Sequence, residues 1–301
     1  MKKFRHFILS HTPEKVVDFA RKLKKALRRK ELKAQQIKGG ISQDEIEISL
    51  RNAGIQSGDS MLVHASLSKI GYVINGPVTI INAMLAVLGK EGTLLMPSFP
   101  ATGRNKDYLS TNIIFDVLET PSAMGIITEV FRKMKNVNRS LHPTDPVCAL
   151  GPLSGYYTNT HFGQLTPYND KSPFRKLAEK NGKILMLGTT LNGAGTSLHT
   201  LEDAVDFPFP VYDEKIFDVT IRNEKGELLK MKTKVHNPIF SAKRNCDALK
   251  PLFEKAGVLT NFKIGEANCM LIDAKGMFDV MIREFNLHGV TMYTPYGQKI
   301  K

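Results

Sequence analysis

The 301-residue sequence predicts an α/β fold in which a central mixed sheet is flanked by helices. Short apolar runs of strand length alternate with longer segments whose apolar residues recur at helical spacing, and this alternation is typical of α/β proteins. The pattern changes near residues 215–235, where two alternating segments flank a turn at 223–227. We therefore expect the C-terminal portion to be α+β and to contain a hairpin.

Residues 1–40 are expected to form a basic helical N-terminal arm. Thr12 and Pro13 are typical of a helix start, and the segment Lys38–Gly40 indicates a break after the helix. The arm holds 13 lysines and arginines against three acidic residues, whereas the other 261 residues carry 29 basic and 26 acidic groups. Most of the net charge of +13 therefore belongs to the arm, and residues 41–301 are predicted to form one nearly neutral domain.

The domain is expected to open with a helix, because Ser42 and Glu45 form a capping-box pattern and Gly54 is suited to the helix end. The later elements follow in chain order. Strands are predicted near 61–63, 92–96, 182–188 and 262–273, and helices near 77–88, 122–134, 243–256 and 276–286.

The composition argues against several classes of protein. No run of 18 apolar residues is present, so no membrane-spanning helix is expected. The basic start lacks the apolar run of a signal peptide, which predicts a cytoplasmic protein. The three cysteines are widely spaced and form no CxxC pair. They favour buried thiols over a disulfide framework or a zinc site, and no bound metal is expected.

His199 and Glu202 are the first candidates for catalysis. They follow the apolar run 182–188 and a glycine-containing loop, and on a helix their spacing places both side chains on one face. A carboxylate beside an imidazole fixes its tautomer and raises its basicity, as a general base requires. A structural ion pair is the other interpretation of the same spacing.

A second candidate segment surrounds Asp170 and Ser172, just before Pro173. Either side chain could cap a helix that starts at the proline. Asp170 could instead hold a substrate ammonium or orient the base.

Two more segments could bind an anion. The strand end at His64 opens into hydroxyls and glycines around Ser66 and Leu67, which could hold phosphates through backbone N–H groups. Arg139 could pair with a phosphate or a carboxylate. His142, three residues later and directly before Pro143, favours a buried structural role over a ligand-binding one.

Together these segments resemble the aminoglycoside 3-N-acetyltransferase family. The most specific stretch is 115–125, F-D-V-L-E-T-P-S-A-M-G, which continues through Glu129, Phe131–Arg132 and Arg139–Pro143. Further matches are Val63–Leu67 with Gly71, Gly92–Phe99, Asp170–Phe174, and Gly188 with His199 and Glu202. The resemblance covers about residues 42–290 and leaves the first 40 residues outside it.

The resemblance implies an acyltransferase that moves an acetyl group from acetyl-CoA directly to an amine without a metal. His199 would then be the general base, Glu202 would orient it, and Asp170 would lie near the acceptor amine. The implied cofactor-binding residues are His64, Ser66, Leu67, Ser98, Arg139, Ser140 and Thr190. Thr190 or its neighbour Thr189 could also stabilise the oxyanion formed from the thioester.

The acceptor stays open at this point. An aminoglycoside is a polycation and needs an acidic cleft, for which Asp170, Glu202, Asp203 and Asp206 are the nearby carboxylates. A nucleotide-linked amino sugar is anionic and would suit a slightly basic surface, with the segment Asp206–Pro210 stacking on a ring.

A hypothesis of a different class is a nucleic-acid or membrane-surface binder that acts through residues 1–40. It predicts that binding weakens steeply with salt and disappears when the arm is deleted. A homo-oligomer is compatible with every one of these hypotheses.

Overall fold

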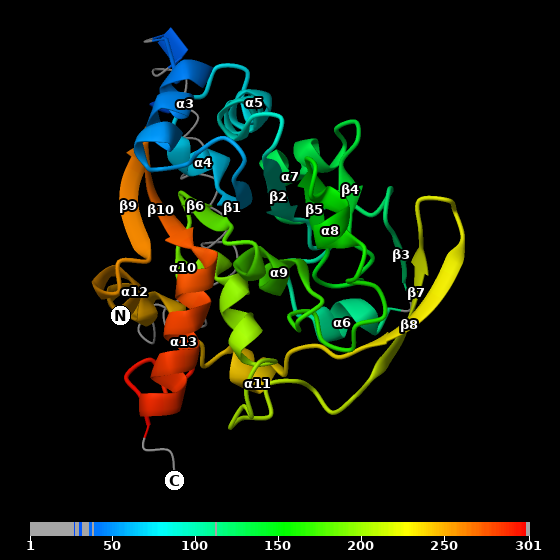
Figure 1. The fold of residues 1–301 in the computed structure, drawn as a ribbon. Coiled ribbons are helices and arrows are strands. Elements are labelled where there is room, and N and C mark those ends of the chain that lie inside the picture. The colour runs from blue at the N-terminus through cyan, green and yellow to red at the C-terminus, as the bar shows by residue number, and fades with distance from the viewer. Residues whose placement is uncertain (1–26, 28–29, 32–35, 38, 112, 299–301) are drawn as a thin grey trace.

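The computed structural model describes residues 27, 30–31, 36–37, 39–111 and 113–298. The basic arm proposed for residues 1–40 lies almost wholly outside these residues, so its helix and its boundary with the domain stay predictions. The α/β fold class is confirmed by the rest of the chain (Figure 1).

A seven-stranded mixed sheet forms the centre of the molecule, in the order β4-β5-β2-β1-β6-β10-β9. The three central strands run parallel, and the outer pairs are antiparallel. The strands are β1 (Ser60–Ala65), β2 (Thr93–Pro97), β4 (Asn138–Arg139), β5 (Val147–Leu150), β6 (Lys183–Leu187), β9 (Leu259–Ile264) and β10 (Ala267–Asp273).

Helices cover both faces of this sheet, which explains why its central strands are apolar throughout. Met61 and Val63 of β1 belong to the apolar core on one face, and Leu62 between them belongs to the core on the other. The first face is covered by α3 (Gln43–Asn52), α5 (Pro77–Leu88) and α7 (Ile126–Arg132). The second is covered by α8 (Ser154–Thr158), α9 (Pro173–Glu179), α12 (Lys250–Lys255) and α13 (Ala274–His288).

The predicted hairpin is confirmed as β7 (Phe217–Arg222) and β8 (Leu228–Thr233), which extend along one side of the molecule (Figure 1). Strand β3 (Ile114–Asp116) joins them in a separate three-stranded sheet. The short remaining elements are α4 (Leu67–Ile70), α6 (Asn105–Leu109), α10 (Leu191–Ala194), η1 (Thr196–Leu201), α11 (Pro238–Ser241) and η2 (Cys246–Leu249).

Local sequence signals set some helix ends correctly, and α5 begins and ends where it was predicted. The capping box of Ser42 and Glu45 is present, with both hydrogen bonds formed. The helix expected at 122–134 is shorter, because Gly125 has a φ of +101° and α7 begins only after it. The helix expected at 243–256 begins as the 3-10 turn η2. Within the described residues, no helix is long and apolar enough to cross a membrane.

Candidate active site

His199 lies on the short 3-10 helix η1, which follows β6 and α10, and Glu202 is the C-cap residue of the same helix. The Nδ1 atom of His199 lies 3.0 Å from Oε1 of Glu202. A 3-10 helix has three residues per turn, so side chains three positions apart lie directly above one another. Both residues are buried. The structure therefore brings together the pair expected from the sequence.

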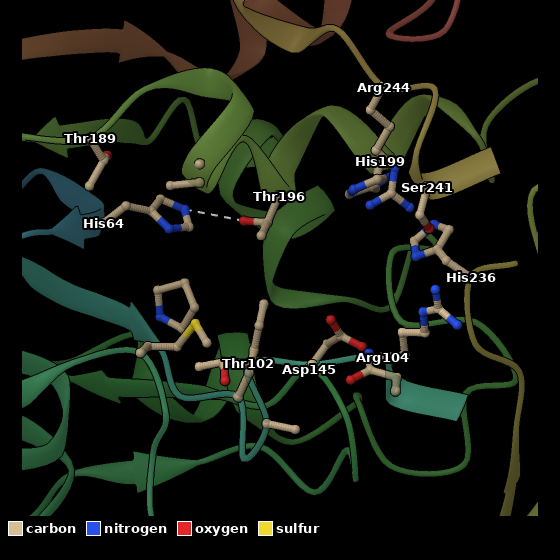
Figure 2. Close-up of a pocket in the computed structure, with 18 of the residues that line it drawn as sticks. His64, Thr102, Arg104, Asp145, Thr189, Thr196, His199, His236, Ser241 and Arg244 are labelled. Atoms are coloured by element: carbon tan, nitrogen blue, oxygen red, sulfur yellow. Dashed lines mark hydrogen bonds between the residues drawn. The ribbon is translucent and has the colours of Figure 1, made fainter. Parts of the chain in front are cut away.

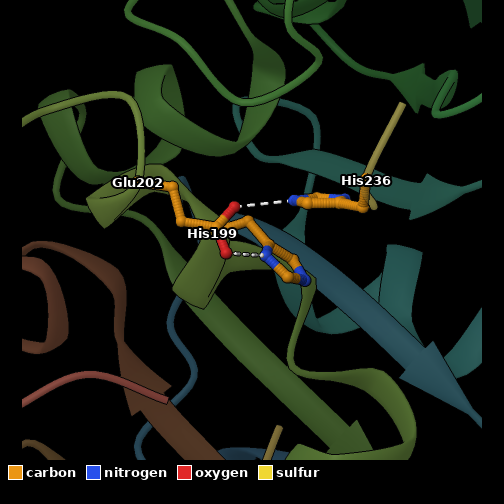
Figure 3. Close-up of side chains that lie close together, drawn as sticks. All are labelled: His199, Glu202 and His236. Atoms are coloured by element: carbon orange, nitrogen blue, oxygen red, sulfur yellow. Dashed lines mark hydrogen bonds and ion pairs between the residues drawn. The ribbon is translucent and has the colours of Figure 1, made fainter. Parts of the chain in front are cut away.

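Glu202 also accepts hydrogen bonds from two distant side chains. Nε2 of His236 lies 2.7 Å from Oε2 (Figure 3). The hydroxyl of Tyr293 donates to Oε1 over 2.6 Å. The imidazoles of His199 and His236 and their hydrogen bonds hold the pKa of Glu202 well below its usual value, against the effect of burial. Glu202 is therefore a fixed carboxylate anion.

This hydrogen bonding defines the state of His199. A carboxylate only accepts hydrogen bonds, so the ring N–H of His199 must be at Nδ1, and Nε2 carries a lone pair. Burial lowers the pKa of His199 well below the ordinary histidine value, and the charge of Glu202 opposes this effect. The imidazole is neutral at pH 7 and can accept a proton at Nε2.

Within the described residues, one group of side chains has the composition and spacing of possible metal ligands. It consists of His199, Glu202 and His236, whose ligand atoms all lie within 4.8 Å of one another. Each imidazole, however, directs an N–H at a different oxygen of Glu202. The two nitrogens that face Glu202 therefore have no lone pair for a metal held among these three side chains, although the other nitrogen of each neutral ring keeps one. The arrangement fits a hydrogen-bonded catalytic group better than a metal site.

A cavity of about 750 Å³ opens beside His199 (Figure 2). His64 at the end of β1 and Thr189 after β6 line it, so it lies at the carboxyl ends of neighbouring parallel strands, where α/β proteins bind ligands. His64 is held by Thr196, with its Nε2 atom 3.1 Å from the hydroxyl oxygen. Other residues of the wall are Arg104, Asp145, Tyr168, His236, Ser241 and Arg244.

A second cavity, of about 940 Å³, adjoins the first. Ala65 and Met124 line both, so the two cavities meet there. Ser66 and Leu67 lie in the wall of the second cavity. Its other lining is mostly glycine and apolar side chains from the loop 71–76 and from the start of α7.

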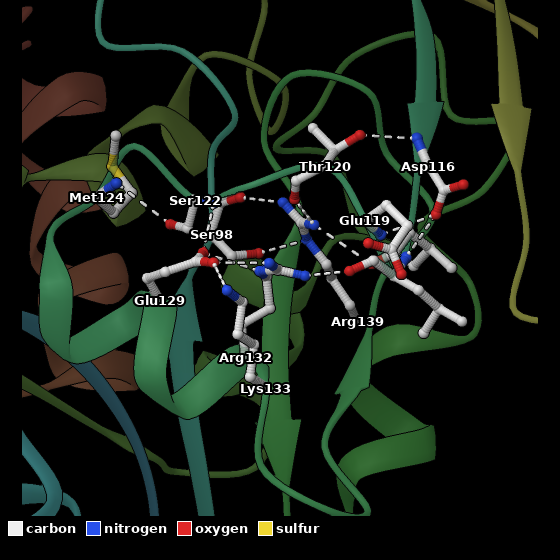
Figure 4. A network of polar contacts seen from close by, with 12 residues as sticks. Ser98, Asp116, Glu119, Thr120, Ser122, Met124, Glu129, Arg132, Lys133 and Arg139 are labelled. Atoms are coloured by element: carbon white, nitrogen blue, oxygen red, sulfur yellow. Dashed lines mark hydrogen bonds and ion pairs between the residues drawn. The ribbon is translucent and has the colours of Figure 1, made fainter.

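Other residues expected at the site have structural contacts. Arg139 donates from Nε and Nη2 to the hydroxyl and carbonyl oxygens of Ser98, and from Nη1 to the carbonyls of Val117 and Thr120 (Figure 4). These bonds connect β4 to the segment 115–125, which carries the most specific family motif. Neither Arg139 nor Ser98 lines the cavity beside His199.

The remaining three expected residues do not line the cavity beside His199 either. Ser140 is buried and bonds to Nδ1 of His161 over 2.9 Å. Thr190 caps α10 and contacts Asp247. The Asp170 side chain is 67% exposed and pairs with Lys171, outside the wall of either large cavity. Ser172, and not Asp170, caps α9.

Arg139→Ala is expected to lower the free energy of unfolding by about 2–4 kcal/mol, because carbonyl oxygens in the interior lose their donors. Urea unfolding measures the change. Arg222→Ala is the control, since its ion pair with Asp116 is half exposed and should contribute less than about 1 kcal/mol. An Arg139→Ala protein of unchanged stability with lost coenzyme affinity would contradict this structural role.

His236 and Tyr293 belong to the candidate site through their bonds to Glu202, and sequence reasoning missed both. They lie 34 and 91 positions from Glu202. No local motif links either residue to Glu202. The only signal in the sequence is the position of His236 two residues before Pro238, where a helix was free to start.

Comparison with known proteins decides the family. The model of the family described as aminoglycoside 3-N-acetyltransferase matches residues 62–286. The chain belongs to this family. The resemblance found from the motifs is therefore confirmed, and the protein is a member of a family of acyltransferases.

Individual relatives agree with this family. Aminoglycoside N(3)-acetyltransferase IV of Salmonella sp is 32% identical over 162 residues, which are 54% of this chain and 59% of the relative. Aminoglycoside N(3)-acetyltransferase III of Salmonella sp is 25% identical over 282 residues, covering 86% of this chain and 97% of that protein. The chain thus spans well under two thirds of the first relative and nearly all of the second.

Solved structures share the fold. Aminoglycoside acetyltransferase AAC(3)-Xa superposes with a TM-score of 0.73 at 24% identity, over 87% of this chain and 97% of the other. The complex of AAC-IIIb with CoASH has a TM-score of 0.70 at 26% identity, over 82% of this chain and 98% of the other.

Proposed function

We propose that this member of the family transfers an acetyl group from acetyl-CoA to the amino group of an amino sugar, with His199 as the general base. The observation that carries the proposal is the neutral His199, oriented by Glu202, in the wall of a cavity that meets a second one at Ala65 and Met124. One cavity suits the acceptor and the other suits the donor.

The chemistry follows from the state of His199. The amine nitrogen attacks the carbonyl carbon of the thioester, a C–N bond forms and the C–S bond breaks. The attacking amine loses a proton to Nε2 of His199, and the imidazolium that forms is stabilised by Glu202. His199 then returns this proton to the departing thiolate. Glu202 takes the role of the orienting carboxylate in this proposal, since it bonds to His199, whereas the exposed side chain of Asp170 lines neither large cavity.

The second cavity is our proposed site for the donor. Its mixture of apolar side chains and the hydroxyls of Ser66 and Ser68 suits a pantetheine chain, which alternates methylene and amide groups. The relative AAC-IIIb is known in a binary complex with CoASH, and this supports the same donor here. His64 and Thr189 line the first cavity near the shared residues, and their polar groups are suited to the oxyanion.

Relatives support an amino sugar as the class of acceptor. AAC(3)-IVa, in a histidine-to-alanine mutant, forms a complex with a gentamicin, and AAC-VIa binds sisomicin. Both ligands are aminoglycosides.

Release of free thiol from acetyl-CoA, followed with a panel of amino sugars, tests the proposal. We expect acceptor-dependent thiol release and an acetylated product by mass spectrometry. Calorimetry should show coenzyme A binding without any acceptor. A protein that binds no coenzyme A and releases no thiol with any amino sugar would refute the proposed function.

A further inference from the structure

The wall of the cavity beside His199 has the wrong charge for a polycation. An aminoglycoside carries several ammonium groups, and each one that is removed from water needs an acceptor, most effectively a carboxylate. In the part of the chain that the structure describes, Asp145 is the one carboxylate of this wall, whereas Arg104 and Arg244 both line it.

Asp145 is also poorly available to an ammonium. It is buried, and its two oxygens already accept hydrogen bonds from the hydroxyls of Tyr168, over 2.7 Å, and Thr144, over 2.6 Å. Burial raises the pKa of its carboxyl above the ordinary value, which weakens it further as an anion. The acceptor cavity therefore offers little to neutralise positive charge.

Arg244 has an unused donor in the site. Its Nε donates to the hydroxyl of Tyr293 over 3.3 Å, but Nη2 is buried with no hydrogen-bond partner among the described residues. A guanidinium is always charged and its N–H fork matches two oxygens of a phosphate or carboxylate. Because a buried donor without a partner is costly, a small movement of the side chain that brings Nη2 to a ligand oxygen in the cavity would be favourable.

Arg104 adds a second guanidinium to the same cavity. Its side chain is exposed at the start of α6, and no ion pair joins it to another described residue. Figure 2 shows both arginine side chains on the side of the cavity that holds His236 and Ser241, with Arg244 beside His199. The neighbouring cation Lys106 is different, because Asp213 neutralises it over 2.7 Å.

We propose that the acceptor is an amine that also carries an acidic group, a phosphate or a carboxylate, which Arg244 binds with help from Arg104. This inference rests on the proposed function and narrows its substrate class to acidic amino sugars, including nucleotide-linked ones. Arg244 orients the acidic group, and the amine then lies within reach of His199. A polycationic aminoglycoside is a poor acceptor on this account.

Matched acceptors test the inference directly. Glucosamine 6-phosphate, a uridine-diphosphate-linked amino sugar, glucosamine and gentamicin are each assayed by thiol release with the full-length protein. Charge-assisted hydrogen bonds predict a kcat/KM about 10- to 100-fold higher for an acidic acceptor than for glucosamine. Arg244→Gln should remove most of this preference, mainly by raising the KM of the acidic acceptors. Arg104→Gln should act in the same direction but by only a few fold, because its charge is exposed and screened.

Controls separate folding and function from specificity. Arg283→Gln alters an exposed arginine on α13 and should keep the wild-type preference. Arg244→Lys serves as a second variant in case Arg244→Gln folds poorly. It keeps the positive charge, so it should keep part of the preference for acidic acceptors. Equal turnover of neutral and acidic acceptors, or a preference for gentamicin that survives Arg244→Gln, would overturn the inference while leaving acetyl transfer intact.

A calorimetric arm keeps the inference testable without turnover. If no acceptor is acetylated, the proposed function fails. The affinities of the protein for glucosamine 6-phosphate and for glucosamine then still test whether the cavity has a subsite for an acidic group. Tighter binding of the phosphorylated sugar that is lost in Arg244→Gln supports the subsite. Equal binding, or no binding of either sugar, overturns it.

Discussion

His199→Ala is expected to slow acetyl transfer by about 100- to 10 000-fold, the usual contribution of a general base. The variant removes the nitrogen that accepts the amine proton, but it leaves Ser66 and Leu67 in the second cavity untouched. Coenzyme A should therefore bind with the wild-type affinity in a calorimeter, while kcat falls. Steady-state thiol release with the best acceptor of the panel measures the loss.

Two companion variants separate the base from its surroundings. Glu202→Gln replaces one accepting oxygen with an NH2 group that must face an N–H or O–H donor, so it should also reduce kcat strongly. His288→Ala changes an exposed histidine at the end of α13 and should leave the rate unchanged. Wild-type turnover in His199→Ala would remove the histidine from the mechanism.

The sequence could predict the parts of this site that are local in the chain. His199 and Glu202 are three residues apart, and a single turn of η1 joins them. The strands β1 and β6 were equally visible, because both faces of the sheet are buried and the middle of each strand is therefore apolar. Their carboxyl ends then placed His64 and Thr189 at one edge of the sheet.

Contacts between distant segments could not be predicted in this way. His236 and Tyr293 reach Glu202 from the connection after β8 and from the C-terminal tail, and their positions depend on how those segments pack. Arg139 illustrates the opposite error. A guanidinium donates equally well to a phosphate or to backbone carbonyls, so the motif could not reveal that its donors are used within the protein.

Substrate class shows the same limit. The net charge of the domain is small, yet the cavity wall contains two arginines from different parts of the chain, near α6 and near η2. The net charge of the domain does not show how its charged residues are distributed among cavities and surfaces. Only the fold shows which charges share a cavity, and this is why the acidic acceptor follows from the structure and stays open from the sequence.

Buried histidines make the stability of the fold depend strongly on pH. Burial lowers the pKa of His64 to about 4 and that of His161 to about 3, and it lowers the pKa of His142 well below the ordinary value. His161 is fixed in the neutral form, because its Nε2–H donates to the carbonyl of Pro167 over 3.0 Å and its Nδ1 accepts from Ser140. His142 stacks on it with ring centroids 4.5 Å apart.

We expect the free energy of unfolding to fall as the pH drops below about 6.5, where the unfolded chain gains protons that the folded protein excludes. Each of these three histidines contributes a slope of about 1.4 kcal/mol per pH unit, so together they give about 4 kcal/mol per unit between pH 6 and pH 5. The total loss down to pH 5 is about 6 kcal/mol, so a domain at the lower end of the usual range of about 5–15 kcal/mol would come close to unfolding there. Urea unfolding at pH 7.5, 6.5 and 5.5 measures the effect.

Substitution of a single histidine should change that slope in proportion. His161→Gln removes one titrating group. The slope of the free energy of unfolding against pH should therefore fall by about 1.4 kcal/mol per pH unit, even though the variant is less stable at pH 7.5. His288→Gln alters the exposed histidine of α13 and should keep the full slope. A stability that stays constant from pH 7.5 to pH 5.5 would mean that the interior admits the charged imidazoles, which contradicts the energetic cost of burying them.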